Sequence, residues 1–77
     1  MQEKLLEILQ QDVLESDEAI TPETDLFALG LDSMAIMQLL LFIEDEFGIA
    51  LEPTDLSRDH FQTAAKITRL LESKRNA

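Results

Sequence analysis

The sequence predicts an all-α protein: a four-helix bundle with three main helices, one short helix, and a long loop between the first and second helices. Three observations support this fold class. Apolar residues recur at helical spacing in three separate segments. No segment alternates apolar and polar residues as a half-buried strand would. The chain has only two Gly and two Pro residues, and they fall where the periodic pattern is interrupted.

Residues 3–14 form the first predicted helix. Its apolar side chains return every three or four positions, with charged residues between them, as in an amphipathic helix. These apolar residues are Leu5, Leu6, Leu9 and Val13. One face of the helix must therefore pack against the rest of the chain.

Residues 15–32 are predicted to form a long loop. The helical periodicity fails there, and turn-forming residues appear at Asp17, Thr21-Pro22, Asp25 and Gly30. Loops longer than about 12–15 residues are uncommon in a compact domain and tend to be functional. We expect the loop to be anchored to the core by Leu26, Phe27 and Leu29.

The second helix is predicted over residues 33–47, which contain no Gly or Pro. Its apolar stripe consists of Ile36, Leu39, Leu40, Ile43 and Phe47. Either Asp32 or Ser33 is suited to cap its start, because both side chains accept hydrogen bonds from early backbone N–H groups. Gly48 is suited to end it in the left-handed conformation.

A short or irregular helical turn is predicted over residues 53–58. Pro53 suits a first helical position, and we expect the turn to be interrupted by Ser57, Asp59 and His60. The last helix is predicted over residues 63–74, with Thr63 as its cap and Lys74 and Arg75 near its negative end. Its apolar stripe consists of Ala64, Ile67, Leu70 and Leu71.

The charge of the chain limits its partners. Sixteen acidic residues against six basic ones give a net charge of −10, which repels nucleic acid and anionic lipid. We therefore expect no nucleic-acid or membrane partner, and we expect protein partners with basic surfaces. Residues 1–59 carry 15 of the acids and only two bases, Lys4 and Arg58.

The length and composition of the chain restrict the kinds of protein that it can be. Seventy-seven residues suffice for one domain, which we assign to residues 1–77. The absence of Cys excludes disulfides and thiolate metal sites. There is no run of about 18 apolar residues, and the N-terminus lacks the layout of a signal peptide. We expect a monomer in the cytoplasm.

The stretch Leu29-Gly30-Leu31-Asp32-Ser33-Met34 is the strongest indication of a functional site. It places the Ser33 hydroxyl between a glycine-containing loop and the start of a helix. A helix start offers unpaired N–H groups and the positive end of the dipole, so a phosphodiester on Ser33 would be stabilised there. The stretch therefore predicts a reachable, modifiable serine.

These residues resemble the acyl and peptidyl carrier proteins, whose modified serine sits in a motif like Gly30-Leu31-Asp32-Ser33-Met34. The second predicted helix and its exit, ending in Ile43-Glu44-Asp45-Glu46-Phe47-Gly48-Ile49, are also similar to that family. The resemblance implies that Ser33 carries 4′-phosphopantetheine taken from coenzyme A. It also implies that Asp32 helps a phosphopantetheinyl transferase to hold its magnesium ion.

Differences between this sequence and the fatty-acid carriers of the family indicate its subgroup. Fatty-acid carriers usually have acids two and five places after the serine, where this chain has Ala35 and Gln38. The sequence is more similar to the small stand-alone carriers loaded with amino acids, including the D-alanyl type. That similarity rests on Ala35, Gln38-Leu39, Ile43-Glu44 and Leu56-Ser57-Arg58-Asp59-His60-Phe61.

The function implied is that of a carrier rather than an enzyme. It would hold acyl or aminoacyl groups as thioesters and shuttle them from a loading ligase to a downstream transferase or synthase. We expect these enzymes to recognise Leu31, Asp32, Met34, Met37, Gln38 and Glu44. The acids Glu44, Asp45 and Glu46 would steer basic partners by long-range attraction. The nature of the cargo and the pathway stay open.

The same residues allow other interpretations. Ser33 alone might be an ordinary helix cap, and Leu31 and Met34 might be core residues. A serine hydrolase is excluded because Ala35 replaces the second glycine of a Gly-x-Ser-x-Gly elbow. We assign no metal site and no catalytic role to His60. The remaining alternative is an unmodified acidic helical module that binds other proteins.

Overall fold

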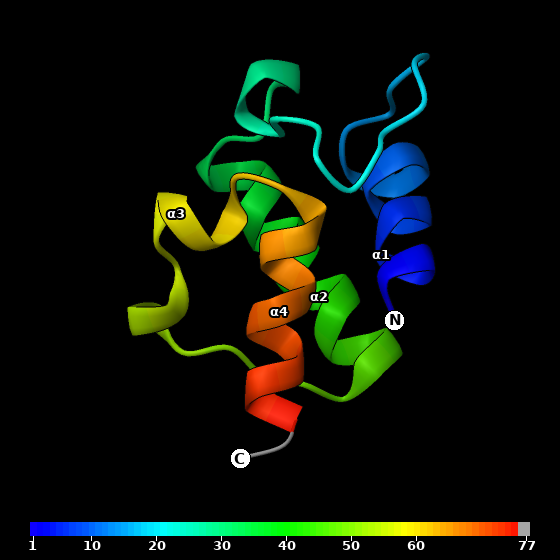
Figure 1. Ribbon diagram of the computed structural model, residues 1–77. Coiled ribbons are helices and arrows are strands. Elements are labelled where there is room, and N and C mark those ends of the chain that lie inside the picture. Colours follow the sequence, from blue (N-terminus) through cyan, green and yellow to red (C-terminus); the bar gives the residue numbers. More distant parts are fainter. Residues whose placement is uncertain (76–77) are drawn as a thin grey trace.

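The computed structural model describes residues 1–75 and confirms the all-α prediction (Figure 1). The main helices are α1 (Gln2–Ile8), α2 (Ser33–Phe47) and α4 (Ala64–Arg75), with a short α3 (Arg58–Phe61). The long loop crosses one end of the bundle between α1 and α2 (Figure 1). The described residues contain no strand, and none of their helices is long and apolar enough to cross a membrane.

The first helix continues beyond α1 as a π-helical turn over Leu9–Val13. The Leu14 N–H donates to the Leu9 carbonyl at 2.9 Å, five residues back. Glu15 then takes a φ of 49°, a left-handed conformation that side chains rarely adopt. The first helical segment thus ends at the predicted place. Its last turn is π-helical, which the apolar periodicity did not indicate.

Gln10 holds the first part of the long loop. Its Nε2 donates to the carbonyls of Ser16 at 2.7 Å and Glu18 at 2.6 Å. Its Oε1 accepts from the Ile20 N–H at 2.8 Å. One amide side chain thereby satisfies three backbone groups of a segment with no regular structure. It also places Ile20 in the core, where that side chain is buried.

We predict that Gln10→Glu destabilises the protein by about 1–3 kcal/mol. A carboxylate keeps the acceptor for Ile20 but replaces the two donors with oxygens that face carbonyl oxygens. Chemical denaturation measures the loss, and faster hydrogen exchange at the Ile20 N–H locates it. A Gln10→Glu chain as stable as the wild type would contradict the proposed role.

The second part of the loop forms a compact turn that leads into α2. A 3₁₀ helix over Phe27–Leu29 ends at Gly30, whose φ of 104° is left-handed. The Leu31 N–H donates to the Leu26 carbonyl, and the Gly30 N–H donates to the Phe27 carbonyl. This pair of bonds is the Schellman arrangement that commonly closes a helix. Gly30 is required for its backbone angle, since no heavy atom lies within 4 Å of where a Cβ would stand.

The core is built from the apolar stripes of α1, α2 and α4, with contributions from the loops. Leu26 is fully buried, while Phe27 and Leu29 pack against the core partly exposed, so the predicted anchoring of the loop is confirmed. The buried apolar residues are Leu5, Ile8, Leu9, Ile20, Leu26, Leu31, Leu39, Ile43, Ile49, Phe61, Ala64, Ile67 and Leu71. This core fixes α2 with one face inward and the other face outward.

The predicted short turn over residues 53–58 begins at Pro53 as expected, but it ends earlier than predicted. A 3₁₀ turn covers Pro53–Asp55, and the short helix α3 follows at Arg58–Phe61. Ser57 does not interrupt a helix there; it starts one, because its Oγ accepts from the His60 N–H at 3.2 Å. Asp59 and His60 therefore lie within α3. The helix brings the fully buried Phe61 into the core.

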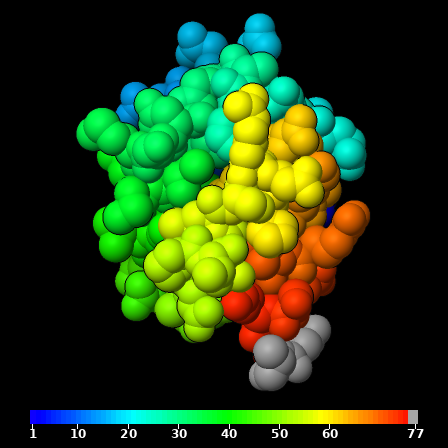
Figure 2. Space-filling view, turned by 90° about the vertical axis from the view of Figure 1, so that its left-hand side faces the viewer, coloured from blue at the N-terminus to red at the C-terminus, as the bar shows by residue number. Residues whose placement is uncertain are grey.

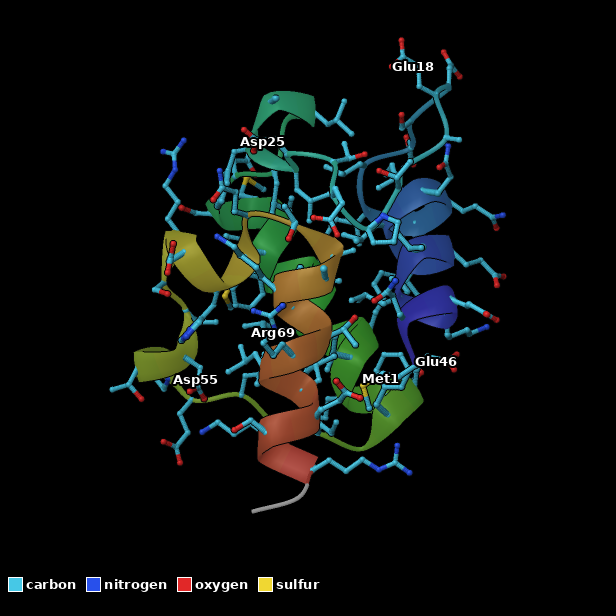
Figure 3. The ribbon with its side chains drawn as sticks, viewed as in Figure 1. Met1, Glu18, Asp25, Glu46, Asp55 and Arg69 are labelled. Carbon is cyan, nitrogen blue, oxygen red and sulfur yellow. The ribbon has the colours of Figure 1, made fainter. Side chains whose placement is uncertain are left out.

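Asp55 and Lys74 tie the 3₁₀ turn to the end of α4. The Lys74 Nζ lies 2.9 Å from the Asp55 Oδ2, which also accepts from the Glu52 N–H at 2.9 Å. Asp55 lies beside the lower half of α4 (Figure 3). The hydrogen bond from Lys74, helped by that from Glu52, holds the pKa of Asp55 below its ordinary value. The same pair raises the pKa of Lys74.

This pair predicts a specific pH dependence of stability. Since the pKa of Asp55 is lowered by folding, the pair stabilises the protein fully above about pH 4. That contribution is lost as the pH falls through the lowered pKa. Asp55→Asn should reduce the melting temperature at neutral pH, and its difference from the wild type should vanish in acid. Parallel melting curves across this pH range would contradict the prediction.

Candidate functional site

Ser33 is the first residue of α2 and is exposed. The Schellman turn positions it: the chain leaves the left-handed Gly30, buries Leu31 in the core, and then exposes Asp32 and Ser33. No side-chain hydrogen bond within residues 1–75 uses the Ser33 hydroxyl. The hydroxyl is therefore both accessible and uncommitted.

Asp32 takes the capping role that the sequence left open between Asp32 and Ser33. Its Oδ1 accepts from the Ala35 N–H at 2.8 Å, with an extended backbone at Asp32. Because Asp32 caps the helix, the Ser33 hydroxyl is not needed as a cap. The ordinary-cap interpretation of Ser33 is thus wrong, and by contrast the Ser57 hydroxyl is engaged as a cap at the start of α3.

Two variants of Asp32 distinguish the contribution of its capping hydrogen bond to stability from that of its negative charge. Asp32→Ala should lower the free energy of unfolding by about 1 kcal/mol, because the Ala35 N–H loses its acceptor. Asp32→Asn retains an acceptor and should stay close to wild-type stability. Urea denaturation measures both values. Equal losses in the two variants would show that the charge, and not the cap, is what stabilises α2.

The start of α2 leaves backbone N–H groups unpaired next to Ser33. The Ile36 N–H is the first to donate to a carbonyl of the helix start, at Asp32. No hydrogen bond of the described residues satisfies the N–H groups of Ser33 and Met34. Free N–H groups and the positive end of a 15-residue helix stabilise an anion. The residues present therefore fit a phosphodiester linked to the Ser33 oxygen.

An exposed apolar stripe runs along α2 from the same end. Met34, Met37 and Leu41 have exposed fractions of 79%, 59% and 68%. Their spacing of three and four residues places them on one face of the helix. Glu44 continues the stripe and, with Leu41 and Asp45, lines an open hollow of about 440 Å³. We call Met34, Met37, Leu41 and Glu44 the α2 stripe.

The structure separates the predicted recognition residues into two groups. Asp32, Met34, Met37, Gln38 and Glu44 are exposed. Leu31 is not: only 3% of it is exposed, because the Schellman turn packs it with Leu26 in the core. Its assignment as a surface contact is corrected to a core residue. The sequence missed Leu41, although its spacing from Met34 and Met37 was a usable signal.

The acids Glu44, Asp45 and Glu46 are exposed in the last turns of α2. Negative charge at a helix C-terminus opposes the helix dipole, typically by about 0.3–1 kcal/mol per group. Figure 3 places Glu46 beside Met1, at the opposite end of the bundle from Glu18 and Asp25. These acids therefore do not stabilise α2 through its dipole.

His60 and the acidic residues do not form a metal centre. The His60 Nδ1 lies 3.0 Å from the Asp55 carbonyl oxygen, which accepts its proton and holds the ring against the 3₁₀ turn. Within residues 1–75, no group of three or more His, Asp or Glu side chains is arranged to hold a metal ion. The contacts of His60 are therefore structural.

Comparison with known proteins agrees with this geometry. Residues 3–71 match the family described as the phosphopantetheine attachment site, and the match includes the long loop, Ser33, the whole of α2 and α3, and most of α1 and α4. The chain therefore belongs to the phosphopantetheine-dependent acyl carrier protein family. The cofactor of this family is 4′-phosphopantetheine, as the resemblance at Ser33 implied.

Among its relatives, the chain is similar to carriers of amino acids. It is 38% identical over 73 residues to a D-alanyl carrier protein of Listeria monocytogenes, covering 92% of each chain. It is 31% identical over 64 residues to aminoacyl carrier protein 1 of Bradyrhizobium diazoefficiens, covering 83% of this chain and 69% of that one. Both similarities agree with the subgroup that the sequence favoured.

Solved structures show the same fold. A structure of an engineered Bradyrhizobium japonicum glycine:[carrier protein] ligase with the carrier protein from Agrobacterium tumefaciens and AMP matches with a TM-score of 0.75 and 31% identity, over 100% of both chains. Another, of the Bradyrhizobium japonicum ligase with glycylated carrier protein, matches with a TM-score of 0.67 and 29% identity over 90% of both chains. In those complexes the carrier is bound to a loading ligase.

Proposed function

We propose that this chain is an aminoacyl carrier protein, with 4′-phosphopantetheine attached through Ser33. The observation that carries the proposal is that Asp32 and Ser33 have different roles at the start of α2. Asp32 caps the helix, so the exposed Ser33 hydroxyl is left free beside unpaired N–H groups. The family match over residues 3–71 supports the same conclusion.

The residues of the chain position the arm and perform no chemistry themselves. When attached, the arm supplies a thiol that holds the carboxyl group of the cargo as a thioester. The Schellman turn with Gly30 presents Ser33 outward, and the start of α2 stabilises the negative charge of the linkage. Tethering keeps the cargo at high effective concentration for each partner enzyme. We therefore propose a carrier that is not itself an enzyme.

The cargo proposed is an amino acid. The relatives named for their cargo carry aminoacyl or D-alanyl groups, and one matched structure contains a glycylated carrier. The partners are then a phosphopantetheinyl transferase, an aminoacyl-loading ligase and a downstream transferase. Residues 1–77 form the carrier domain in this proposal, of which 76–77 lie outside the described residues. The monomeric state and the cytoplasm stay predictions.

The α2 stripe is the proposed contact surface for these enzymes. It begins next to Ser33 and exposes three large apolar side chains, an unusual feature for a surface without a partner. Acids border it at Asp32 and at Glu44 and Asp45. An apolar centre with a charged rim is typical of a protein interface. The expected partner surface is apolar at its centre and basic at its edge.

Incubation with coenzyme A, magnesium and a broad-specificity transferase tests the proposal. Intact-mass spectrometry should show one added phosphopantetheine per chain. A second incubation with an amino acid, ATP and a glycine:[carrier protein] ligase should then add an aminoacyl mass. A folded wild-type chain that gains no mass in the first step would support the alternative, an unmodified acidic module that binds other proteins.

A further inference from the structure

A small cleft separates α3 from α4. It has a volume of about 130 Å³ and is lined by Asp59, His60, Lys66 and Arg69. Figure 2 views the molecule with α3 in the centre, α2 on one side and α4 on the other. Arg69 lies in the middle of α4 (Figure 3). The cleft is thus formed by different helices from those that carry Ser33 and the α2 stripe.

Basic groups are concentrated at this cleft. The chain has six Lys and Arg residues and one His, and three of these seven side chains line the cleft. Other cations are engaged elsewhere: Arg58 stacks 4.7 Å above the Phe27 ring, and Lys74 pairs with Asp55. In a protein of net charge −10, the two cations Lys66 and Arg69 outnumber the one acid of the cleft, Asp59.

The internal partners of these cations are weak. Lys66 lies 3.7 Å from the Asp59 carboxylate, whose side chain is 88% exposed. Ion pairs this exposed are screened by water and contribute little. The hydrogen bond from Lys66 to Gln62 is long, at 3.3 Å, and Arg69 forms no ion pair with another residue in the described part of the chain. Both cations are therefore available to an external anion, and Arg69 can bind a carboxylate through two N–H groups.

The walls of the cleft are already held in place. On the α3 side, His60 is fixed twice: its N–H donates to the Ser57 Oγ, and its Nδ1 donates to the Asp55 carbonyl. On the α4 side, the Thr63 Oγ1 accepts from the Lys66 N–H at 3.2 Å and caps the helix. A preformed site loses less entropy on binding than one that must be ordered.

We propose that the α3–α4 cleft is a second docking surface, which binds an acidic segment of a partner protein. A protein segment fits better than a free ion, because the cations are open to solvent and one small anion would be held only by screened contacts. A segment adds contacts around the cleft. Opposite charges on two faces would let the carrier distinguish partners and fix its orientation. This docking proposal depends on the proposed carrier function in one respect: a carrier is expected to bind several partner enzymes.

The test is a titration of ¹⁵N-labelled protein at low salt with an acetylated, amidated tetraglutamate peptide. The wild type should show saturable shifts at His60, Lys66 and Arg69. The double variant Lys66→Gln/Arg69→Gln should raise the apparent Kd about tenfold or more. The control Lys4→Gln/Arg75→Gln has the same net charge and should bind like the wild type. Melting curves verify that both variants fold.

Three outcomes would overturn the proposal. The first is an absence of saturable shifts in the wild type, and the second is an equal loss of binding in the control variant. The third is inorganic phosphate binding as tightly as the peptide at equal ionic strength, which would indicate a small-anion site instead. Repeating the titration with Ser33→Ala, which cannot be modified, keeps this result independent of the proposed carrier function.

Discussion

Replacing Ser33 by alanine should abolish the addition of phosphopantetheine completely. The variant removes the one oxygen that stands free at the start of α2, while Asp32 continues to cap the helix through the Ala35 N–H. Since the Ser33 hydroxyl makes no hydrogen bond within the described chain, stability should change by less than about 0.5 kcal/mol. Intact-mass spectrometry and thermal melting, run on the same sample, measure the two effects.

The chain offers a matched control for this experiment at Ser57. That serine also lies at the start of a helix and is exposed, but its hydroxyl caps α3. Ser57→Ala should therefore lose about 1 kcal/mol of stability and keep the full added mass. The opposite pattern, with modification retained in Ser33→Ala or lost in Ser57→Ala, would place the attachment elsewhere and remove the basis of the proposed function.

Asp32 links the stability of the site to its modification. The family resemblance implies that this carboxylate assists the transferase with its magnesium ion, while the structure shows the same carboxylate capping α2. The two roles make different demands, since an amide also caps but binds a cation poorly. If both roles hold, Asp32→Asn is modified slowly and melts normally. The aspartate would then be needed at this position for its charge and not for its cap.

The sequence predicted α2 and its start more accurately than any other element. Residues 33–47 were bounded by strong signals: a capping Asp before the helix and Gly48 after it, which takes a φ of 67°. Caps and left-handed glycines act through the adjacent backbone, so they can be recognised without tertiary information. The position of Ser33 was therefore predictable, and so was the loop that precedes it.

The remaining features of the fold depend on how the backbone turns. No pattern in the sequence singles out Gln10, yet its side chain bonds to residues six to ten positions away. Leu31 lies only two residues before Ser33 in the sequence, but the turn at Gly30 directs it inward. The sequence pattern predicts an interruption of the helical turn at Ser57, whereas Ser57 starts α3, as serine favours. Each case depends on where the backbone turns, which periodicity does not encode.

α2 carries more apolar residues than one inward face needs. Its predicted apolar stripe is confirmed: Leu39 and Ile43 are buried, and Ile36, Leu40 and Phe47 pack against the core. Eight residues in succession, Ala35–Phe42, nevertheless include only one polar side chain, Gln38, so apolar residues also occupy other directions around the axis. The structure shows that the surplus lies on the α2 stripe, where it is exposed. This surplus favours an interface over a folding role.

Two leucines of α2 test whether its buried face stabilises the fold and its exposed face serves as an interface. Leu39 is fully buried and Leu41 is 68% exposed, although they have the same chemistry and are only two positions apart. Leu39→Ala should lower the free energy of unfolding by about 2–5 kcal/mol through lost burial and the cavity left behind. A domain of this length is stable by roughly 4–12 kcal/mol, so the variant should be severely weakened.

Leu41→Ala should by contrast change stability by no more than about 0.5 kcal/mol. If the α2 stripe contacts the loading ligase, this variant should still lose ligase affinity, because it removes apolar area next to Met37 and Glu44. Urea denaturation gives the first value, and the Michaelis constant of the ligase for the carrier gives the second. A stability loss in Leu41→Ala close to that of Leu39→Ala would mean that this side chain belongs to the core, and the stripe would no longer be an interface.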